Sequence, residues 1–323
     1  MINWQIAESN RIEKVNTIEN LVDVDSIKVK VTKCLITRSD IGAFLGESKV
    51  KFPITPCSIA VGQITETLQE SNYFSKGDKV FLHPDLTKDG SLVQNGLLKE
   101  FAVIDKSNCF ILPKQVSENT ALFLKHISLA LSVIDKLNVE KGEYVAIIGG
   151  SILANITAQL LNYYKAVPIL IDSDEENLNI ARQTDVYYAL NLDKRTETEV
   201  KEITGGRMCN KVIYVSDDDL NVDNVIKLSA QNAKVAITGI ADVKQKLNLS
   251  QAFQKQLSIR FIKKSDENYE TSINLLVLKA LNLNYFKLTE NNSDGIQRQF
   301  DNAVKKIENG EKNVEFIINL MEL

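Results

Sequence analysis

The chain has 323 residues, of which 44% are hydrophobic and 25% are charged, and its formal net charge is -4. This composition is ordinary for a globular protein of one large or two medium domains, and it lacks the basic excess typical of nucleic-acid binding. No apolar run approaches the roughly 20 residues that span a bilayer, and the N-terminus lacks a basic-then-apolar signal, so we expect a cytoplasmic protein that binds neither nucleic acid nor membrane.

The first third of the chain is predicted to be rich in short β-strands. Residues 27–31 alternate apolar and polar side chains, as a half-buried strand does. Further strands are predicted at residues 59–64, 79–82 and 100–104. Many short strands separated by turns indicate a small barrel-like domain.

From residue 118 onward, predicted helices alternate with predicted strands. Apolar residues at helical spacing extend over 118–137, and an apolar strand typical of burial on both faces follows at 144–148. The other predicted elements are helix 154–164, strand 167–171, helix 175–184, strands 212–215 and 235–238, helices 273–281 and 296–307, and strand 314–318. The alternation favours a parallel, doubly wound sheet in the middle of the chain.

A glycine-rich turn follows the strand at 144–148. Residues 149–154 read Gly-Gly-Ser-Ile-Leu-Ala, close to the Gly-x-Gly-x-x-Gly/Ala turn at which a helix N-terminus binds a pyrophosphate. Asp172 ends the next strand, about 20 residues farther on, where an acid accepts hydrogen bonds from the adenosine ribose. The expected cofactor-binding residues of this segment are Gly149, Gly150, Ser151, Leu153, Ala154 and Asp172.

Ser151 departs from this motif, because a glycine normally stands at its position. Its Cβ lies where the backbone should approach the phosphate, although Gly150 beside it partly compensates. The domain can therefore have this fold without binding a dinucleotide, and that alternative stays open. If a cofactor binds, Asp172 favours NAD over NADP, because a carboxylate repels the 2′-phosphate of NADP.

Four stretches of the chain form an ordered set of motifs: VKVTKCLITRSDIGAFLG at 29–46, FPITPCSIAVGQI at 52–64, FSKGDKVF at 74–81, and the segment 138–182 around the glycine-rich turn. In this order they resemble the zinc-type alcohol, polyol and threonine dehydrogenases of the medium-chain dehydrogenase/reductase superfamily. The resemblance implies an α/β protein with a GroES-like β-barrel domain, residues 1–118 and 263–323, and a Rossmann domain, residues 119–262. It also implies a nicotinamide cofactor, a small-molecule substrate in the cleft between the domains, and a homodimer or homotetramer.

The same resemblance indicates which metal-binding residues are missing. Members with a catalytic zinc have a Cys ligand where this chain has Thr37, a His ligand where it has Ser58, and a Cys or Glu where it has Lys125. Zinc is bound by thiolate, imidazole and carboxylate, and two hydroxyls and an ammonium cannot replace them. Residues 82–99 contain no cysteine, so the four-cysteine cluster of the structural zinc is missing as well. We therefore expect neither zinc site.

Three residues next to Thr37 match positions that have roles in some of the zinc enzymes. By resemblance, Arg38 contacts the cofactor pyrophosphate, Ser39 relays the alcohol proton, and Asp40 is an acid behind the metal site. Each also has a structural interpretation. Ser39 and Asp40 are common in turns and helix caps, and Arg38 also suits a solvated surface charge.

Lys125 lies near the expected hinge between the domains. A lysine there can polarise a carbonyl or stabilise an enolate, although an ion pair or a solvent-facing position is the more common role. For His83 and His126, a hydrogen-bonded structural role is expected rather than acid catalysis. Cys34 and Cys57 are expected to be buried small apolar residues rather than nucleophiles.

These residues support three functional hypotheses. The first is a zinc-independent NAD(P)(H)-dependent oxidoreductase acting on a small carbonyl, alcohol or enone, with Ser39 and either Lys125 or Thr37 holding the developing oxyanion. The second is an inactive dehydrogenase-like protein that senses a dinucleotide or serves as a scaffold. The third is a metal enzyme that uses unconventional ligands, such as Asp40, His83 or His126.

Overall fold

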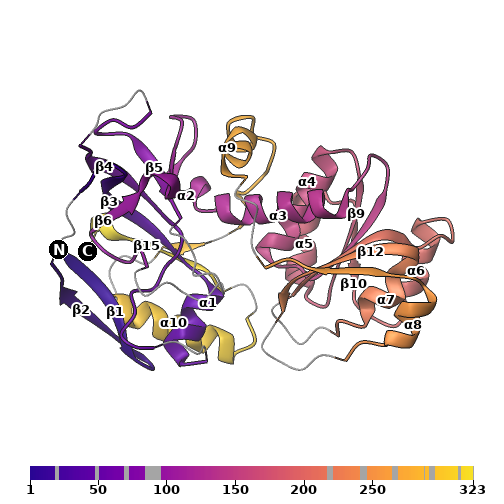
Figure 1. Ribbon diagram of the computed structural model, residues 1–323. Helices are drawn as coiled ribbons and strands as arrows, with labels where there is room; N and C mark the ends of the chain where they lie inside the picture. The colour runs from indigo at the N-terminus through magenta and orange to yellow at the C-terminus, as the bar shows by residue number, and fades with distance from the viewer. Residues whose placement is uncertain are drawn as a thin grey trace. The chain divides into compact units, whose positions relative to one another are not determined.

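The computed structural model describes residues 1–18, 22–47, 51–68, 73–83, 96–216, 221–240, 246–263, 268–286, 288–290, 295–311 and 314–322. The chain divides into two compact units, one formed by Met1–Lys125 with Lys287–Leu323 and the other by His126–Phe286 (Figure 1). The domain ranges expected from the sequence, with borders after residues 118 and 262, differ from these units mainly in residues 263–286. In the described part of the chain, no helix has the length and apolar character to cross a membrane.

Strand β3 (Ser26–Ile36) organises the first unit, in a sheet with seven described strands. Their order is β14-β15-β3-β4-β5-β7, and β6 also pairs with β3. The partners of β3 and their neighbours are β4 (Ala60–Glu66), β5 (Lys79–Leu82), β6 (Phe101–Asp105), β7 (Cys109–Ile111), β14 (Thr289–Glu290) and β15 (Phe316–Asn319). The predicted strands near 27–31, 59–64, 79–82 and 100–104 are thus present, and β3 continues five residues beyond the predicted end.

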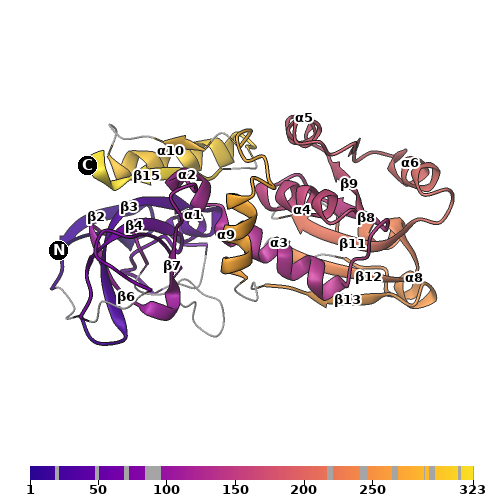
Figure 2. The same ribbon diagram turned by 90° about the horizontal axis from the view of Figure 1, so that it is seen from above.

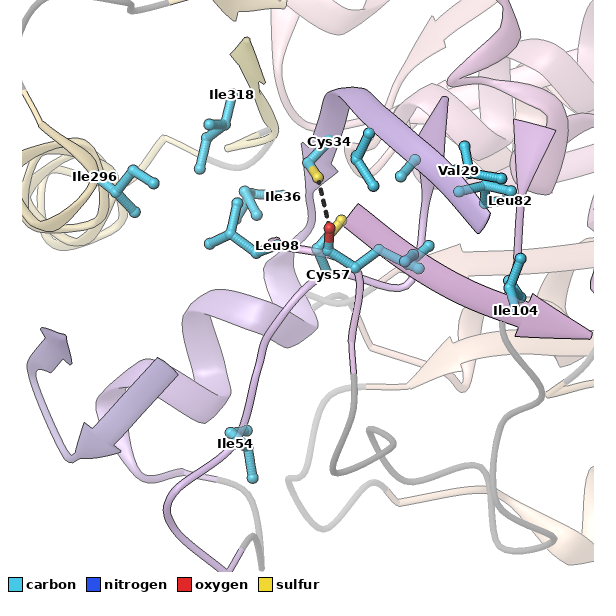
Figure 3. Packing of buried hydrophobic residues seen from close by; sticks show 14 of the residues in the cluster. Val29, Cys34, Ile36, Ile54, Cys57, Leu82, Leu98, Ile104, Ile296 and Ile318 are labelled. Carbon is cyan, nitrogen blue, oxygen red and sulfur yellow. Dashed lines mark hydrogen bonds between the residues drawn. The ribbon is translucent and has the colours of Figure 1, made fainter. Parts of the chain in front are cut away.

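The C-terminal segment completes this N-terminal sheet. Strand β15 pairs antiparallel with β3, with Phe316 opposite Ile36, so the last strand of the chain lies beside the third (Figure 2). Ile318 of β15 and Ile296 of helix α10 (Ile296–Glu308) pack into one apolar cluster with Val29 of β3 (Figure 3). Fully burying such a side chain contributes about 1.5–3 kcal/mol, which ties the two ends of the chain together.

The first unit also contains elements that the sequence patterns did not predict. Strands β1 (Ile2–Glu8) and β2 (Arg11–Asn16) form an antiparallel hairpin. A short helix, α1 (Arg38–Leu45), follows β3, and two 3-10 turns span Lys106–Asn108 and Leu320–Glu322.

The helical spacing of apolar residues over 118–137 corresponds to two helices, α2 (Glu118–Ala121) and α3 (Leu124–Leu137). The amide of Phe123 bonds to the carbonyl of Thr120, three residues back, instead of four. This tighter 3-10 geometry ends the first helix, although the apolar spacing runs on through the break. The break lies directly before Lys125, in the first turn of α3.

The second unit is built on a sheet of six described parallel strands, in the order β10-β9-β8-β11-β12-β13. The strands are β8 (Tyr144–Ile148), β9 (Val167–Asp172), β10 (Tyr188–Asn191), β11 (Cys209–Ser216), β12 (Ser229–Ile240) and β13 (Ser258–Phe261). This is the strand order of the Rossmann fold. The strands are added outward in one direction from β8 to β10 and in the other direction from β11 to β13, so the switch point lies between β8 and β11. The predicted doubly wound sheet is therefore confirmed.

Helices connect these strands: α4 (Ile152–Tyr163), α5 (Glu175–Gln183), α6 (Thr196–Ile203), α7 (Asn224–Leu228) and α8 (Leu249–Gln254), followed by α9 (Tyr269–Val277). Helix α4 contacts β8 and β9, and α5 contacts β9 and β10 (Figure 1). Val200 of α6, Val225 of α7 and Ala252 of α8 form a core with one face of the sheet. Ligands of such folds bind outside the carboxyl ends of the strands, which here places the turns after β8 and β9 at a candidate site.

Candidate functional site

A buried carboxylate, Asp40, lies at the centre of the first unit's candidate site. Asp40 is the third residue of α1 and is 0% exposed. Its Oδ2 accepts hydrogen bonds from the backbone amide of Thr37 at 2.9 Å and from the Thr37 hydroxyl at 2.8 Å. Its Oδ1 accepts a third, from the backbone amide of Cys57 at 2.8 Å. The carboxylate therefore caps α1 and also fixes the segment that leads into β4.

Cys57 adopts a backbone conformation that favours glycine. Its φ is +78°, in the left-handed region that costs a side-chain-bearing residue energy. The hydrogen bond from its amide to Asp40 helps to hold this conformation, and its thiol donates to the carbonyl of Ile59 at 3.0 Å. Burial raises the pKa of the Cys57 thiol well above its ordinary value, which agrees with the prediction that Cys57 is a small buried residue rather than a nucleophile.

Lys125 reaches the same part of the unit. Its Nζ donates a hydrogen bond to Ser58 Oγ at 3.0 Å. Burial lowers the pKa of Lys125, while the Asp40 and Glu315 carboxylates oppose that effect. Burial also raises the pKa of Asp40, against the effects of its hydrogen bonds and of the nearby Lys125 ammonium. Burial thus disfavours the charged form of each group, while the charge of each favours the charged form of the other.

Ser58 also contacts His83. The backbone carbonyl of Ser58 lies 2.9 Å from His83 Nδ1, and the His83 ring stacks on Phe81 with centroids 6.5 Å apart. Because a carbonyl oxygen can only accept, Nδ1 carries the proton in this contact. The contact agrees with the structural role expected for His83.

The donor set at the zinc-equivalent positions does not fit a zinc ion. Thr37, Ser58 and Lys125 supply two hydroxyls and an ammonium, and the ammonium is bonded to one of the hydroxyls. A cation would meet a positive charge where the third ligand should stand. Within the part of the chain that the structure describes, no group of three or more His, Cys, Asp and Glu side chains is placed to hold a metal.

The predicted residues Ser39 and Arg38 lie at the surface end of the site. Ser39 is exposed, and its Oγ lies 2.8 Å from the Thr37 hydroxyl. Arg38 Nη1 forms an ion pair with Glu47 Oε2 at 3.3 Å, with side chains 38% and 53% exposed. The structure brings Thr37, Ser39 and Asp40 into one hydrogen-bonded set, whereas the contact of Arg38 with a cofactor stays a prediction.

In the second unit, the glycine-rich turn has the backbone shape that its sequence predicts. Gly149 has φ +114° and donates its amide to the Ile171 carbonyl at 2.8 Å. Gly150 faces Asn177 of α5, whose Cβ is 2.5 Å from where a Cβ at position 150 would stand. A side chain at residue 150 would therefore collide with α5, so Gly150 is required for close packing of the turn.

Ser151 is the N-cap of α4. Its Oγ accepts a hydrogen bond from the Ala154 amide at 3.3 Å, so the hydroxyl uses one amide at the helix N-terminus. The amides of Ile152 and Leu153 lie in the first turn, where a helix offers no acceptor of its own. They remain suited to an anion, which is the fit that a dinucleotide pyrophosphate requires.

Asp172 ends β9 as predicted, but it is only 1% exposed. Its Oδ1 accepts hydrogen bonds from the Asp174 amide at 2.7 Å and from Asn177 Nδ2 at 3.4 Å. Among the described residues, both of these bonds fall on one oxygen, so Oδ2 is the candidate acceptor for a ribose hydroxyl. Asn177 thus contacts both the glycine turn and the acid.

Sequence reasoning missed the central position of Asp40 and the role of Asn177. A signal for Asp40 was present, since Thr37-x-x-Asp40 has the spacing of a capping pair before a helix. No local pattern marks Asn177, because its contacts arise from the packing of α5 on the turn after β8. The positive φ of Cys57 was also detectable, because the zinc dehydrogenases that the chain resembles have glycine there.

Comparisons with known proteins agree with this architecture. A family model described as alcohol dehydrogenase GroES-like domain matches residues 23–114, and one described as zinc-binding dehydrogenase matches residues 153–277. An uncharacterized zinc-type alcohol dehydrogenase-like protein of Haemophilus influenzae is 23% identical over 287 residues, which cover 81% of this chain and 82% of that protein.

Solved structures of dehydrogenases share the fold of the chain, among them two from Escherichia coli. An oxidoreductase/dehydrogenase of unknown specificity from Escherichia coli, involved in membrane biogenesis, has a TM-score of 0.88 at 14% identity and covers 98% of both chains. A short chain alcohol dehydrogenase from Escherichia coli, solved with the cofactor NADH, has a TM-score of 0.84 at 16% identity and covers 99% of both chains. At these identities the likeness establishes the fold.

Proposed function

Because this chain belongs to the medium-chain dehydrogenase/reductase superfamily, we propose that it is a zinc-independent oxidoreductase that uses NAD(H) and a small carbonyl, alcohol or enone substrate. The observation that carries the proposal is the contrast between the two units. The second unit keeps the glycine turn and the acid of a dinucleotide site, while the first has a lysine ammonium where a metal ligand would stand.

The residues proposed to hold the dinucleotide are those of the turn and of the strand end. The Ile152 and Leu153 amides would bind the pyrophosphate, and Asp172 would accept from the ribose. A bound nicotinamide would supply or accept the hydride. The NADH complex of a structural relative supports this choice of cofactor class, and the carboxylate of Asp172 supports NAD over NADP.

The first unit would hold the substrate oxygen. In the absence of a metal, an oxygen that gains negative charge needs hydrogen-bond donors or a fixed cation. The exposed Ser39 hydroxyl and the Lys125 ammonium are the proposed donors, with Thr37 behind Ser39. Reduction of an activated double bond makes the smallest demand for Lewis-acid help, so enones and quinones are the preferred substrates of the proposal.

A second candidate function is a dinucleotide sensor or scaffold without turnover. Two observations favour it: Ser151 occupies the Ala154 amide, and Asp172 is almost fully buried. As a result, the ligand-free protein offers fewer hydrogen-bonding groups to a dinucleotide. Turnover, rather than binding alone, separates this candidate from the first.

The test is a pair of fluorescence titrations with NADH and with NADPH, followed by NADH oxidation with a panel of enones, quinones and aldehydes. We expect saturable binding that prefers NADH, and turnover of at least one enone or quinone. The matched variant Asp172→Asn, which keeps Oδ1 for the Asp174 amide, should bind NADH more weakly and lose the preference against NADPH. Tight binding without turnover across the panel would favour the sensor, and no binding by folded protein would contradict both functions.

A further inference from the structure

Three oxygen atoms form a hydrogen-bonded row from the surface of the first unit to its interior. The row runs from the exposed Ser39 hydroxyl to the Thr37 hydroxyl at 2.8 Å, and from Thr37 to Asp40 Oδ2 at 2.8 Å. Ser39 is exposed and Asp40 is 0% exposed. Every link has the length of a good O–H···O hydrogen bond.

The direction of the hydrogens in this row is fixed by its inner end. An ionised carboxylate can only accept, so the Thr37 hydroxyl donates to Asp40, and Ser39 must then donate to Thr37. If Asp40 carries a proton on Oδ2, the row reverses, so that Asp40 donates to Thr37, Thr37 to Ser39, and Ser39 outward. The two arrangements differ by the transfer of one proton along the row.

We propose that Asp40 is the acid–base group of this site and exchanges a proton with the substrate through the hydroxyls of Thr37 and Ser39. The inference rests on the proposed function. In the reductive direction NADH gives a hydride to carbon, and Ser39 gives its proton to the substrate oxygen or carbanion. Ser39 takes the proton of Thr37, and Thr37 takes that of Asp40, which is left as carboxylate; oxidation runs these transfers in reverse.

The surroundings of Asp40 suit a group that changes its protonation. Burial raises the pKa of the carboxyl, which makes the protonated form accessible at higher pH than for an exposed aspartate. The groups that face it from other elements are the Cys57 amide, before β4, and the Lys125 ammonium on α3, and both favour the ionised form. Burial thus moves the pKa of Asp40 toward the operating pH, which is the direction that suits a general acid or base, and its hydrogen bonds and Lys125 oppose that shift.

Variants of Thr37 distinguish a role in proton transfer from a purely structural role, because the hydroxyl can be removed while the shape of the side chain is kept. Thr37→Val removes the middle oxygen and leaves the backbone amide on Asp40, whereas Thr37→Ser keeps the oxygen. Ser39→Ala removes the outer oxygen at an exposed position, where misfolding is not expected. Thr32→Val is the matched control, since the hydroxyl of Thr32, on β3, bonds to the Val61 carbonyl of the neighbouring strand β4 at 3.1 Å rather than to Asp40.

The experiment has two readouts on these variants. The first is the infrared band of the protonated Asp40 carboxyl in ligand-free protein, identified by its loss in Asp40→Asn and followed against pH. The second is the pH dependence of kcat and KM for NADH oxidation. We expect the band to appear at higher pH than for an ordinary aspartate and to shift in Thr37→Val but not in Thr37→Ser or Thr32→Val.

For turnover, we expect Thr37→Val and Ser39→Ala to lower kcat by about 100-fold, the usual lower range of acid–base catalysis, with the KM for NADH unchanged. Thr37→Ser should restore most of kcat. A wild-type protein that turns over while Thr37→Val and Ser39→Ala keep full kcat would overturn the relay and leave the proposed function intact. A wild-type protein that binds NADH but turns over no substrate would overturn both the relay and the proposed function. Turnover by the wild type therefore distinguishes failure of the relay alone from failure of the proposed function.

Discussion

At the scale of single residues, the candidate site depends on two groups whose burial opposes their charge. Asp40 is stabilised as an anion by two backbone amides and a hydroxyl, and Lys125 lies close enough to influence it. Desolvation nevertheless raises the pKa of Asp40 and lowers that of Lys125. The pKa of each group is thus displaced toward neutrality by burial, while the charge of each favours the charged form of the other.

The Lys125→Met variant tests whether this pair is coupled. Removal of the ammonium takes away an effect that lowers the pKa of Asp40, so that pKa rises. Because Asp40 must be protonated to give its proton during reduction, the fall of kcat at high pH should then move to higher pH, and kcat at neutral pH should change with it. Lys79→Met, which removes an exposed lysine paired with Glu118 at 3.5 Å, is the control. An unchanged profile in Lys125→Met would show that the two groups act independently.

Asp40 also predicts a direction for stability against pH. Its folded-state pKa is raised, so the folded protein holds the proton more tightly than the unfolded chain. The stability that this contributes is complete below the ordinary aspartate pKa and is lost as pH rises through the folded-state pKa. Urea unfolding of wild type and Asp40→Asn across that window should show the wild-type advantage shrinking as pH rises. An advantage that grows with pH would mean that the three hydrogen bonds outweigh desolvation.

At the scale of elements, the sequence predicted strands best where both faces are buried. The bounds of β8 agree with the prediction, because polar and glycine residues on both sides of an uninterrupted apolar run mark where the strand begins and ends. The hairpin β1–β2 was missed, since most of its side chains are half-buried and its alternation is weak. The break between α2 and α3 could not be predicted, because the apolar spacing continues through Phe123.

The candidate site was predictable only in part, because local sequence patterns identify its residues but not the contacts between them. Thr37, Ser39 and Lys125 were identified from aligned motifs, and the glycine turn and Asp172 from spacing. The contacts that join them, Lys125 to Ser58 and Asn177 to Asp172, connect elements far apart in sequence. Such contacts depend on the packing of whole elements, which periodicity does not encode.

The N-cap of α4 gives a prediction about the phosphate site. Ser151→Ala removes the hydroxyl that accepts from Ala154 and should lower the free energy of unfolding by about 1 kcal/mol, whereas Ser151→Gly should lower it by only a few tenths. Ser151→Gly also frees the amide and the space for a phosphate, so NADH should bind more tightly. Thermal unfolding and fluorescence titration measure the two effects. Weaker NADH binding by Ser151→Gly would mean that the hydroxyl itself serves the ligand.

The packing of α5 on the glycine turn gives a second prediction at this scale. Gly150→Ala places a Cβ 2.5 Å from the Cβ of Asn177 and should lower the free energy of unfolding by roughly 2 kcal/mol. It should also weaken the binding of NADH. Asn177→Gly removes the opposing atom, so the double variant should recover much of the stability lost by Gly150→Ala. A double-mutant cycle on urea unfolding measures this coupling, and additive losses would place the strain elsewhere.

At the scale of the whole molecule, the chain pairs a Rossmann unit with a β-rich unit completed by its own C-terminal strand. We propose that it forms a homodimer or homotetramer. Strand β13 ends the order of described strands, and Phe261 on it is 72% exposed. An exposed aromatic on a sheet edge is a surface suited to a second copy.

Sedimentation of the wild type and Phe261→Lys tests that assembly. The wild type should sediment as a dimer or tetramer, and the charged variant should shift toward monomer at the same concentration. Tyr187→Lys is the control, because Tyr187 is 86% exposed and precedes β10 at the opposite end of the sheet. A wild-type monomer, or an equal shift in both variants, would contradict pairing through β13.

The measurement that tests the central claim most directly is NADH oxidation by protein whose zinc content has been determined before and after treatment with a chelator. With an enone or quinone acceptor, the account predicts less than stoichiometric zinc and the same kcat before and after treatment. Stoichiometric zinc, with activity that is lost on chelation and restored by added zinc, would contradict it.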